Sequence, residues 1–200
     1  MTIKNIIFDF GGVLVEWNPR YLYRNIFSTE TEMEYFLHHI CNDAWNVEQD
    51  RGRTRAEGTQ LLQSQFPEYK DLIQMFYDQW EVMLDSDIPE SVDILHQLKP
   101  HFNLYGLTNW SAETFPIAFK RYAFFQEFLG IIVSGAEKLI KPDPRIFQLI
   151  LDRYNLVAEE SLFIDDNINN INQANSMGFH TIHFQNPTQL RKELNELGLI

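Results

Sequence analysis

The stretch Ile6-Ile7-Phe8-Asp9-Phe10-Gly11-Gly12-Val13-Leu14 decides the fold of this 200-residue chain. An apolar run that is rich in β-branched and aromatic residues and ends at a glycine pair is typical of a buried parallel strand that stops abruptly. We therefore expect Asp9 at the carboxyl end of a strand. In open α/β sheets that edge carries the ligand-binding loops. A single aspartate there can equally cap a turn, so its meaning depends on partners elsewhere in the chain.

Apolar runs alternate regularly with helical patterns after Pro89. The runs that read as strands are 102–107, 129–133, 162–164 and 181–184, with helices between them and a helix at the end of the chain. Strands that alternate with helices form a parallel sheet covered on both faces. The sequence therefore predicts an α/β fold with a Rossmann-like parallel sheet as its core.

The segment from Trp17 to Asp87 has a different character. Its large apolar residues recur at helical spacing, and it has few strand-like runs. The sequence Thr54-Arg55-Ala56-Glu57 has the form of a capping box, which predicts a helix start, and a further helical pattern runs from Leu72 to Met83. We predict an α/β core domain formed by 1–16 and 88–200, with a helical cap domain of 17–87 inserted into it.

Polar residues follow the predicted strands where those strands end. They are Asp9, Thr108 with Asn109, Lys141 in a loop after the third strand, and Asp165 with Asp166. The loop position of Lys141 follows from Pro142, which biases its neighbour to extended backbone, and from Asp143-Pro144, which predicts the start of the next helix. Because the carboxyl ends of parallel strands meet at one edge, these side chains are expected to lie together.

These residue types fit phosphoryl transfer. Three crowded carboxylates raise one another's pKa, and a hard divalent cation relieves that repulsion by binding their oxygens. Mg²⁺ suits the set because it takes few carboxylates and also binds phosphate oxygens. An aspartate can attack phosphorus, while Lys141 and the Thr108 hydroxyl hold and neutralise the transferred group.

In these motifs the chain resembles the haloacid dehalogenase superfamily. It is most similar to the subfamily I phosphatases with a helical cap, among them sugar phosphatases and the N-terminal domain of epoxide hydrolases. The matching motifs, in family order, are Phe8-Asp9-Phe10-Gly11-Gly12-Val13-Leu14, Leu107-Thr108-Asn109, Lys141-Pro142-Asp143-Pro144, and Phe163-Ile164-Asp165-Asp166-Asn167 with Asn170. Each is weak alone, but four in order around a cap-sized insertion form a strong signal.

The resemblance implies a role for each matched residue. Asp9 would be the nucleophile and a metal ligand, and the main-chain carbonyl of Gly11 a second ligand. Asp166, with Asp165 beside it, would complete the Mg²⁺ site. The family further implies that Thr108 and Lys141 bind the phosphoryl oxygens and that Asn109 helps to hold the phosphate. The implied activity is a Mg²⁺-dependent phosphatase that acts on a small phosphorylated metabolite through an aspartyl-phosphate on Asp9.

One position departs from the family. Its phosphatases usually carry a second aspartate two residues after the nucleophile, which protonates the leaving oxygen and activates water, and here that residue is Gly11. General acid–base catalysis contributes roughly 100-fold to 10,000-fold, so a water, the metal or a cap residue would have to replace it. Some sugar phosphatases with helical caps are similar to this chain in having glycine there.

Two other functions stay open at the level of sequence. A metal-free 2-haloacid dehalogenase would also lack the second aspartate, but its relatives resemble one another in a serine-and-asparagine version of the fourth motif, where this chain has Asp165-Asp166. A non-catalytic binding or regulatory protein could keep the fold and metal site without turnover. Retention of the nucleophile, the lysine and the acidic pair together favours the enzyme.

The composition of the chain indicates which classes of binding partner and which cellular compartment to expect. The formal net charge of −12 repels a nucleic-acid backbone, so no nucleic-acid partner is expected. No apolar stretch approaches the roughly 20 residues of a membrane helix, and the first residues lack a signal-peptide layout. Cys41 is the only cysteine, which favours a reducing cytoplasm. A monomer is expected, with an oligomer left open.

Several residues near the motifs are more simply explained by a structural role than by a role in the site. Trp17 and Trp110 lie close in sequence to the first and second motifs, yet tryptophans are more often core residues than substrate platforms. The arginines around residues 51–55 are most simply a solvated helix start. Lys138 lies three residues before the lysine that matches the motif and is expected to face solvent.

Overall fold

A computed structural model describes residues 2–200, so only Met1 of the predicted domains lies outside the described residues. Five parallel strands form the main sheet in the order β5-β4-β1-β6-β7. Their bounds are β1 Asn5–Phe8, β4 Asn103–Thr108, β5 Gly130–Val133, β6 Ser161–Asp165 and β7 His180–His183. The predicted α/β fold with a parallel core sheet is therefore confirmed, and the strand bearing Asp9 lies at its centre.

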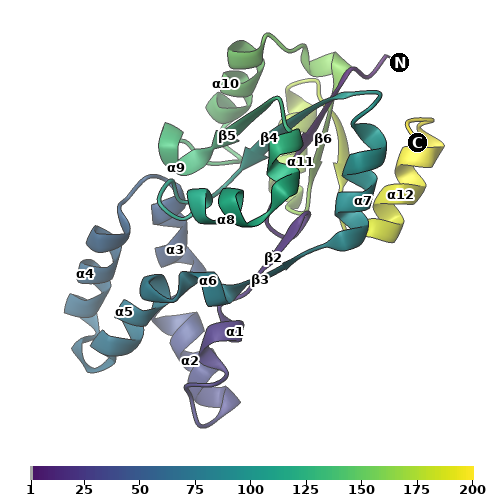
Figure 1. Cartoon of the computed structure of the whole chain (residues 1–200). Coiled ribbons are helices and arrows are strands. Elements are labelled where there is room, and N and C mark those ends of the chain that lie inside the picture. The colour runs from purple at the N-terminus through teal and green to yellow at the C-terminus, as the bar shows by residue number, and fades with distance from the viewer. Residues whose placement is uncertain (1) are drawn as a thin grey trace.

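Alternation along β1 divides the core into two layers. The side chains of Ile6 and Phe8 pack into one buried apolar cluster, whereas that of Ile7 packs into another on the opposite face. This is the pattern expected of a strand buried on both faces. The helices α7 (Pro89–Leu98), α8 (Phe115–Arg121) and α12 (Pro187–Glu196) contribute to the first cluster, and α10 (Pro144–Tyr154) and α11 (Ile168–Ser176) to the second. Figure 1 shows these two sets of helices on either side of the sheet.

The remaining helices of this part are short and lie between strands. They are the 3-10 helices η2 (Ala123–Glu127) and η3 (Ala158–Glu160), and α9 (Ser134–Glu137). As predicted, α10 begins with Asp143 as its N-cap, whose carboxylate accepts from the Arg145 main chain at 2.9 Å, and with Pro144 in its first turn. The loop that carries Lys141 therefore lies between α9 and α10.

Helices make up the inserted segment, which extends away from the sheet in Figure 1. They are α1 (Arg20–Tyr23), α2 (Glu30–His39), α3 (Asp43–Asp50), α4 (Arg55–Gln65), η1 (Pro67–Tyr69), α5 (Lys70–Asp78) and α6 (Trp80–Met83). The capping box predicted at Thr54 is present: its hydroxyl accepts from the Glu57 main chain, and the Glu57 carboxylate accepts from the Thr54 main chain. The helical pattern from Leu72 to Met83 is interrupted, because Gln79 leaves helical backbone geometry and separates α5 from α6.

A two-stranded ribbon joins the insertion to the sheet domain. β2 (Val15–Trp17) and β3 (Leu84–Asp87) pair antiparallel, with Val15 opposite Asp87 and Trp17 opposite Leu84. The sequence analysis did not predict these strands, because each is too short and polar to show a period. The chain thus leaves and re-enters the sheet domain through adjacent, hydrogen-bonded segments, and the predicted limits of the cap, 17 and 87, lie on this ribbon.

Among residues 2–200, none of the helices combines the length and the apolar character that crossing a membrane requires.

Candidate active site

Three adjacent strands place the predicted site residues at one edge of the sheet. Asp9 follows the central strand β1, Thr108 is the last residue of β4, and Asp165 is the last residue of β6. Since β4 and β6 are the two neighbours of β1, these side chains meet at the carboxyl edge. Oxygens of Asp9, Asp165 and Asp166 lie within 4.8 Å of one another.

Lys141 supplies the positive charge of this cluster. Its side chain is fully buried, and its Nζ lies 2.9 Å from Asp9 Oδ2 and 2.6 Å from Asp165 Oδ2. Burial alone would lower the pKa of Lys141, but the charges of Asp165 and Asp9 outweigh it and hold that pKa above its usual value. The lysine therefore stays protonated and neutralises part of the carboxylate charge.

Asn109 fixes the main chain of Lys141. The Lys141 N–H donates to Asn109 Oδ1 at 2.8 Å, and Asn109 Nδ2 donates to the Lys141 carbonyl at 3.0 Å. This two-way contact holds the loop in which Lys141 precedes a cis peptide bond to Pro142. Asn109 is thus engaged with the lysine loop, a contact that the sequence did not predict.

The carboxylates differ in their surroundings. Asp165 has no exposed surface, and it accepts from the Asn167 main chain at 2.8 Å and from Asn170 Nδ2 at 3.0 Å as well as from Lys141. Asp166 faces solvent. Its carboxyl is nevertheless partly surrounded by the cluster, and this partial burial, followed by the charge of Asp165, raises the pKa of Asp166. Asp166 is therefore the more accessible ligand for a cation, while Asp165 already holds the lysine.

Asp9 is poised by opposing effects. Its Oδ1 accepts from the Phe10 main chain at 2.7 Å, and its Oδ2 faces Lys141. Burial raises the pKa of Asp9, the charge of Lys141 lowers it, and the charges of Asp165 and Asp166 raise it further. The net result is a pKa of about 7. A divalent cation beside Asp9 would favour its ionised form, the form a nucleophile needs.

Thr108 and the glycine pair complete the cluster. The Thr108 hydroxyl is buried and has no hydrogen-bond partner among the residues described, which is unusual unless a ligand supplies one. Gly12 has a φ of +73°, and a Cβ there would lie 2.6 Å from Asp166 Oδ2. Glycine at 12 therefore lets the first loop approach Asp166 closely. A Cβ at Gly11, in contrast, would meet nothing within 4 Å.

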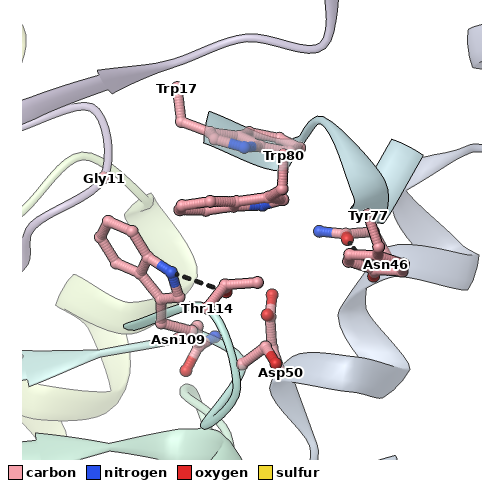
Figure 2. Close-up of a pocket in the computed structure, with 10 residues that line it drawn as sticks. Gly11, Trp17, Asn46, Asp50, Tyr77, Trp80, Asn109 and Thr114 are labelled. Atoms are coloured by element: carbon pink, nitrogen blue, oxygen red, sulfur yellow. Dashed lines mark hydrogen bonds between the residues drawn. The ribbon is translucent and has the colours of Figure 1, made fainter. Parts of the chain in front are cut away.

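A pocket of about 130 Å³ opens beside this cluster, between the sheet domain and the inserted helices. The sheet domain contributes Gly11, Asn109, Trp110, Ser111 and Thr114, and the insertion and its ribbon contribute Trp17, Asn46, Asp50, Tyr77 and Trp80. Figure 2 shows the rings of Trp17 and Trp80 one above the other, with the Asp50 side chain projecting into the space below them.

The structure shows where the tryptophans and basic residues noted in the sequence analysis lie. Trp17 and Trp110 line it, whereas Trp45 packs in the core of the insertion. Arg53 donates to Gln49 Oε1 and to the Trp45 carbonyl, so its contacts lie within the insertion. Lys138 is exposed, as predicted. Asp50 and Tyr77 were not singled out from sequence, because only the folded insertion brings them to the first and second motifs.

The sheet topology, the acidic cluster and the buried lysine define a hydrolase with an α/β core and a helical insertion. The chain belongs to the haloacid dehalogenase-like hydrolase family, whose model matches residues 3–178. This confirms the family predicted from the four motifs.

Relatives and solved structures agree with this assignment. The chain is 27% identical to a sesquiterpene phosphatase of Aspergillus oryzae over 198 residues, which cover 98% of this chain and 97% of the relative. It is 22% identical to a D-ribitol-5-phosphate phosphatase of Bacteroides thetaiotaomicron, with coverage of 96% and 97%. A haloacid dehalogenase family enzyme of the same bacterium, solved with magnesium and inorganic phosphate, superposes with a TM-score of 0.70 at 22% identity, covering 92% of this chain and 95% of that one.

Proposed function

We propose that the chain is a Mg²⁺-dependent phosphatase that hydrolyses a small phosphorylated metabolite through an aspartyl-phosphate on Asp9. One observation carries this proposal. Asp9 lies at the edge of the central strand, within reach of a buried lysine on one side and an acidic pair on the other, and near an unpartnered buried hydroxyl. That combination provides a nucleophile, a cation site and two groups that bind phosphoryl oxygens.

The residues present fit Mg²⁺. Asp9, Asp166 and the Gly11 carbonyl would hold it, with Asp165 supplying negative charge and a further oxygen next to them. When bound, Mg²⁺ neutralises phosphoryl charge and favours ionised Asp9. Two of the similar proteins are phosphatases and a similar structure contains magnesium and phosphate, which supports the same chemistry here.

This chain's own residues would carry out the transfer as follows. Lys141 and the Thr108 hydroxyl bind the phosphoryl oxygens, and an Asp9 oxygen attacks phosphorus as the bond to the leaving alcohol breaks. Water then releases phosphate and regenerates Asp9. The predicted cap of residues 17–87 would close over the site and exclude bulk water. The pocket beneath Trp17 and Trp80 would receive the alcohol part of the ester, for which a sugar or other polyol phosphate is the first choice.

The first test is phosphate release from a panel of sugar, polyol, terpenyl and aryl phosphates, with Mg²⁺ and with chelator. We expect Mg²⁺-dependent release from the wild type, and a loss of at least about 1,000-fold in Asp9→Asn, because the nucleophile is removed. Asp152→Asn, which changes an exposed aspartate on α10, should leave release unchanged.

The same panel separates the alternative functions. Halide release from a 2-haloacid in chelator, without phosphate release, would support the dehalogenase. No release from any compound, with Mg²⁺ still raising the melting temperature, would support a binding or regulatory protein.

A further inference from the structure

The leaving oxygen has no acid on the sheet side of the pocket. The family usually carries one two residues after the nucleophile, where this chain has Gly11. The space that such a side chain would occupy is open, since nothing lies within 4 Å of a Cβ built there. A residue that protonates the leaving alcohol oxygen would therefore have to project into this space from another element.

Asp50, at the end of α3, is the single carboxyl group among the ten residues that line the pocket. Figure 2 shows its side chain pointing from α3 into the cavity, toward Asn109 and Thr114. Gly11 lines the same cavity from the sheet side, so Asp50 and the open space at Gly11 border one pocket between the sheet domain and the insertion.

The sheet domain holds Asp50 in place through its main chain. The hydroxyl of Ser134, the first residue of α9, donates to the Asp50 carbonyl at 2.6 Å. The same hydroxyl accepts from the Trp110 N–H at 2.9 Å. The loop after β4, which carries Asn109, is thus tied through Ser134 to the Asp50 main chain, which is held next to that loop.

The other titratable groups near the pocket are poor candidates. The Tyr77 hydroxyl donates to Asn46 Oδ1 at 3.0 Å and accepts from Gln49 Nε2 at 2.8 Å, and burial raises its pKa well above the usual tyrosine value. Arg53 is bound to Gln49. Burial raises the pKa of Asp50 to about 7, partly offset by a hydrogen bond from the Ser111 main chain. A group with that pKa can both give and take a proton near neutral pH.

We propose that Asp50 is the general acid and base of the reaction, acting from the cap in place of the aspartate that position 11 lacks. This proposal rests on the proposed phosphatase function. In the first step Asp9 forms a bond to phosphorus, the bond from phosphorus to the alcohol oxygen breaks, and protonated Asp50 gives that oxygen its proton. In the second step Asp50 carboxylate takes a proton from the water whose oxygen attacks phosphorus, the bond to Asp9 breaks, and phosphate leaves with Asp50 protonated again.

The test compares two kinds of leaving group in the full-length protein with Mg²⁺. An alkyl phosphate such as ribitol 5-phosphate needs a proton on its leaving oxygen, whereas 4-nitrophenyl phosphate releases a stable anion and does not. In single-turnover measurements of leaving-group release, which report the first step alone, we expect Asp50→Asn to lower the rate for the alkyl ester by roughly 100-fold or more and to change the rate for the nitrophenyl ester only a few-fold. Because the second step is common to both esters, kcat at steady state should fall for both, and the nitrophenyl ester should show a burst. Asp43→Asn, at the start of the same helix, is the matched control and should change neither.

Gly11→Asp provides the second arm, because the open space can accept the side chain. In the Asp50→Asn background it should restore much of the alkyl phosphatase activity, whereas in the wild type it should add little. An equal loss of the single-turnover rate for both esters in Asp50→Asn would overturn the proposal and assign Asp50 to cap docking. A large gain from Gly11→Asp alone would also overturn it, even if Asp50→Asn does not fold, because it would show that the wild type lacks an acid. Absence of Mg²⁺-dependent release from both esters in the wild type would instead contradict the phosphatase function itself.

Discussion

Lys141 keeps its positive charge in a place where burial opposes it. Two carboxylates within 2.9 Å compensate that cost, and the three groups depend on one another. Removing one partner of a buried ion pair leaves the other uncompensated, which costs more than the pair itself contributes. Lys141 is therefore a structural requirement of the site, in addition to its proposed role in binding phosphate.

This dependence leads to a stability prediction. In chelator, Lys141→Met should lower the free energy of unfolding by about 3 kcal/mol, because Asp9 and Asp165 would then be crowded without a cation. Lys138→Met, three residues away and exposed, should change it by about 0.5 kcal/mol or less. Urea unfolding of both variants measures the difference. Equal values for the two would mean that the buried charge is not held as the geometry indicates.

Gly12 matters for a different reason, namely the space it leaves for Asp166. Gly12→Ala would place a Cβ 2.6 Å from Asp166 Oδ2 at a φ of +73°. If Asp166 binds Mg²⁺, its displacement should weaken that binding by about 10-fold to 100-fold, as found for residues that support metal ligands. Calorimetric titration with Mg²⁺ measures this directly.

Gly198→Ala is the control that distinguishes the effect of backbone strain from the effect of the contact between a Cβ at position 12 and Asp166. Gly198 has a similar φ of +69°, but a Cβ there would meet nothing within 4 Å. It should cost stability without changing Mg²⁺ affinity. Unaltered affinity in Gly12→Ala would indicate that Asp166 is not a metal ligand.

At the scale of single residues, the sequence predicted most of the cluster at the sheet edge. Asp9, Thr108, Asp165 and Asp166 lie at or just after the ends of apolar strands, and strand direction alone brings such residues together. Lys141 lies in the loop between α9 and α10 and was predicted from the proline that follows it and from the motif. Asp50 has no such signal, since it ends a helix in the insertion and meets Asn109 only through tertiary packing.

At the scale of elements, the five strands of the sheet were predictable because four of them are largely apolar runs, and the fifth, β7, lies within the β-branched and aromatic stretch 181–184. The ribbon of β2 and β3 was not, because Val15-Glu16-Trp17 is too short to establish a period and Leu84-Asp85-Ser86-Asp87 is mostly polar. Their pairing depends on the folded insertion that brings the two segments together.

Strand β4 shows how tightly the elements fit beneath the site. Gly106 leaves room for the ring of Phe10, since a Cβ there would lie 2.2 Å from Phe10 Cζ. Phe10 follows Asp9 and packs against Phe125 and Phe128. The position of Asp9, the proposed nucleophile, therefore depends on the absence of a side chain at Gly106 in the neighbouring strand.

Gly106→Ala should accordingly destabilise the protein by about 1–3 kcal/mol, the usual cost of overpacking a core. It should also reduce phosphatase activity, because displacement of Phe10 moves Asp9. Gly11→Ala, whose Cβ meets nothing within 4 Å, is the matched substitution for stability and should cost less. Unfolding in urea gives both values, and similar losses in the two variants would contradict the packing argument.

At the scale of the whole molecule, the two parts of the chain share one apolar core. A single cluster of buried residues includes Phe8 and Phe10 of the sheet domain together with Phe36 and Phe76 of the insertion. The predicted limits of the insertion rest on a change of pattern in the sequence. The shared core has no such signal, because it joins residues that are far apart in the chain. Continuous burial favours unfolding in one cooperative step.

Cys41 can test that cooperativity. It lies between α2 and α3, is buried, and is the only cysteine of the chain, and burial raises the pKa of its thiol well above the usual value. We expect it to resist a thiol reagent at pH 8 in the native protein, because neither the thiolate nor access is available. In increasing urea, labelling should rise together with the change in tryptophan fluorescence, since opening of the insertion would require breaking the shared core. Labelling that saturates at clearly lower urea than the fluorescence transition would show that the insertion unfolds on its own. In that case closure over the active site would involve local unfolding of the cap rather than movement of a folded cap about the β2–β3 ribbon.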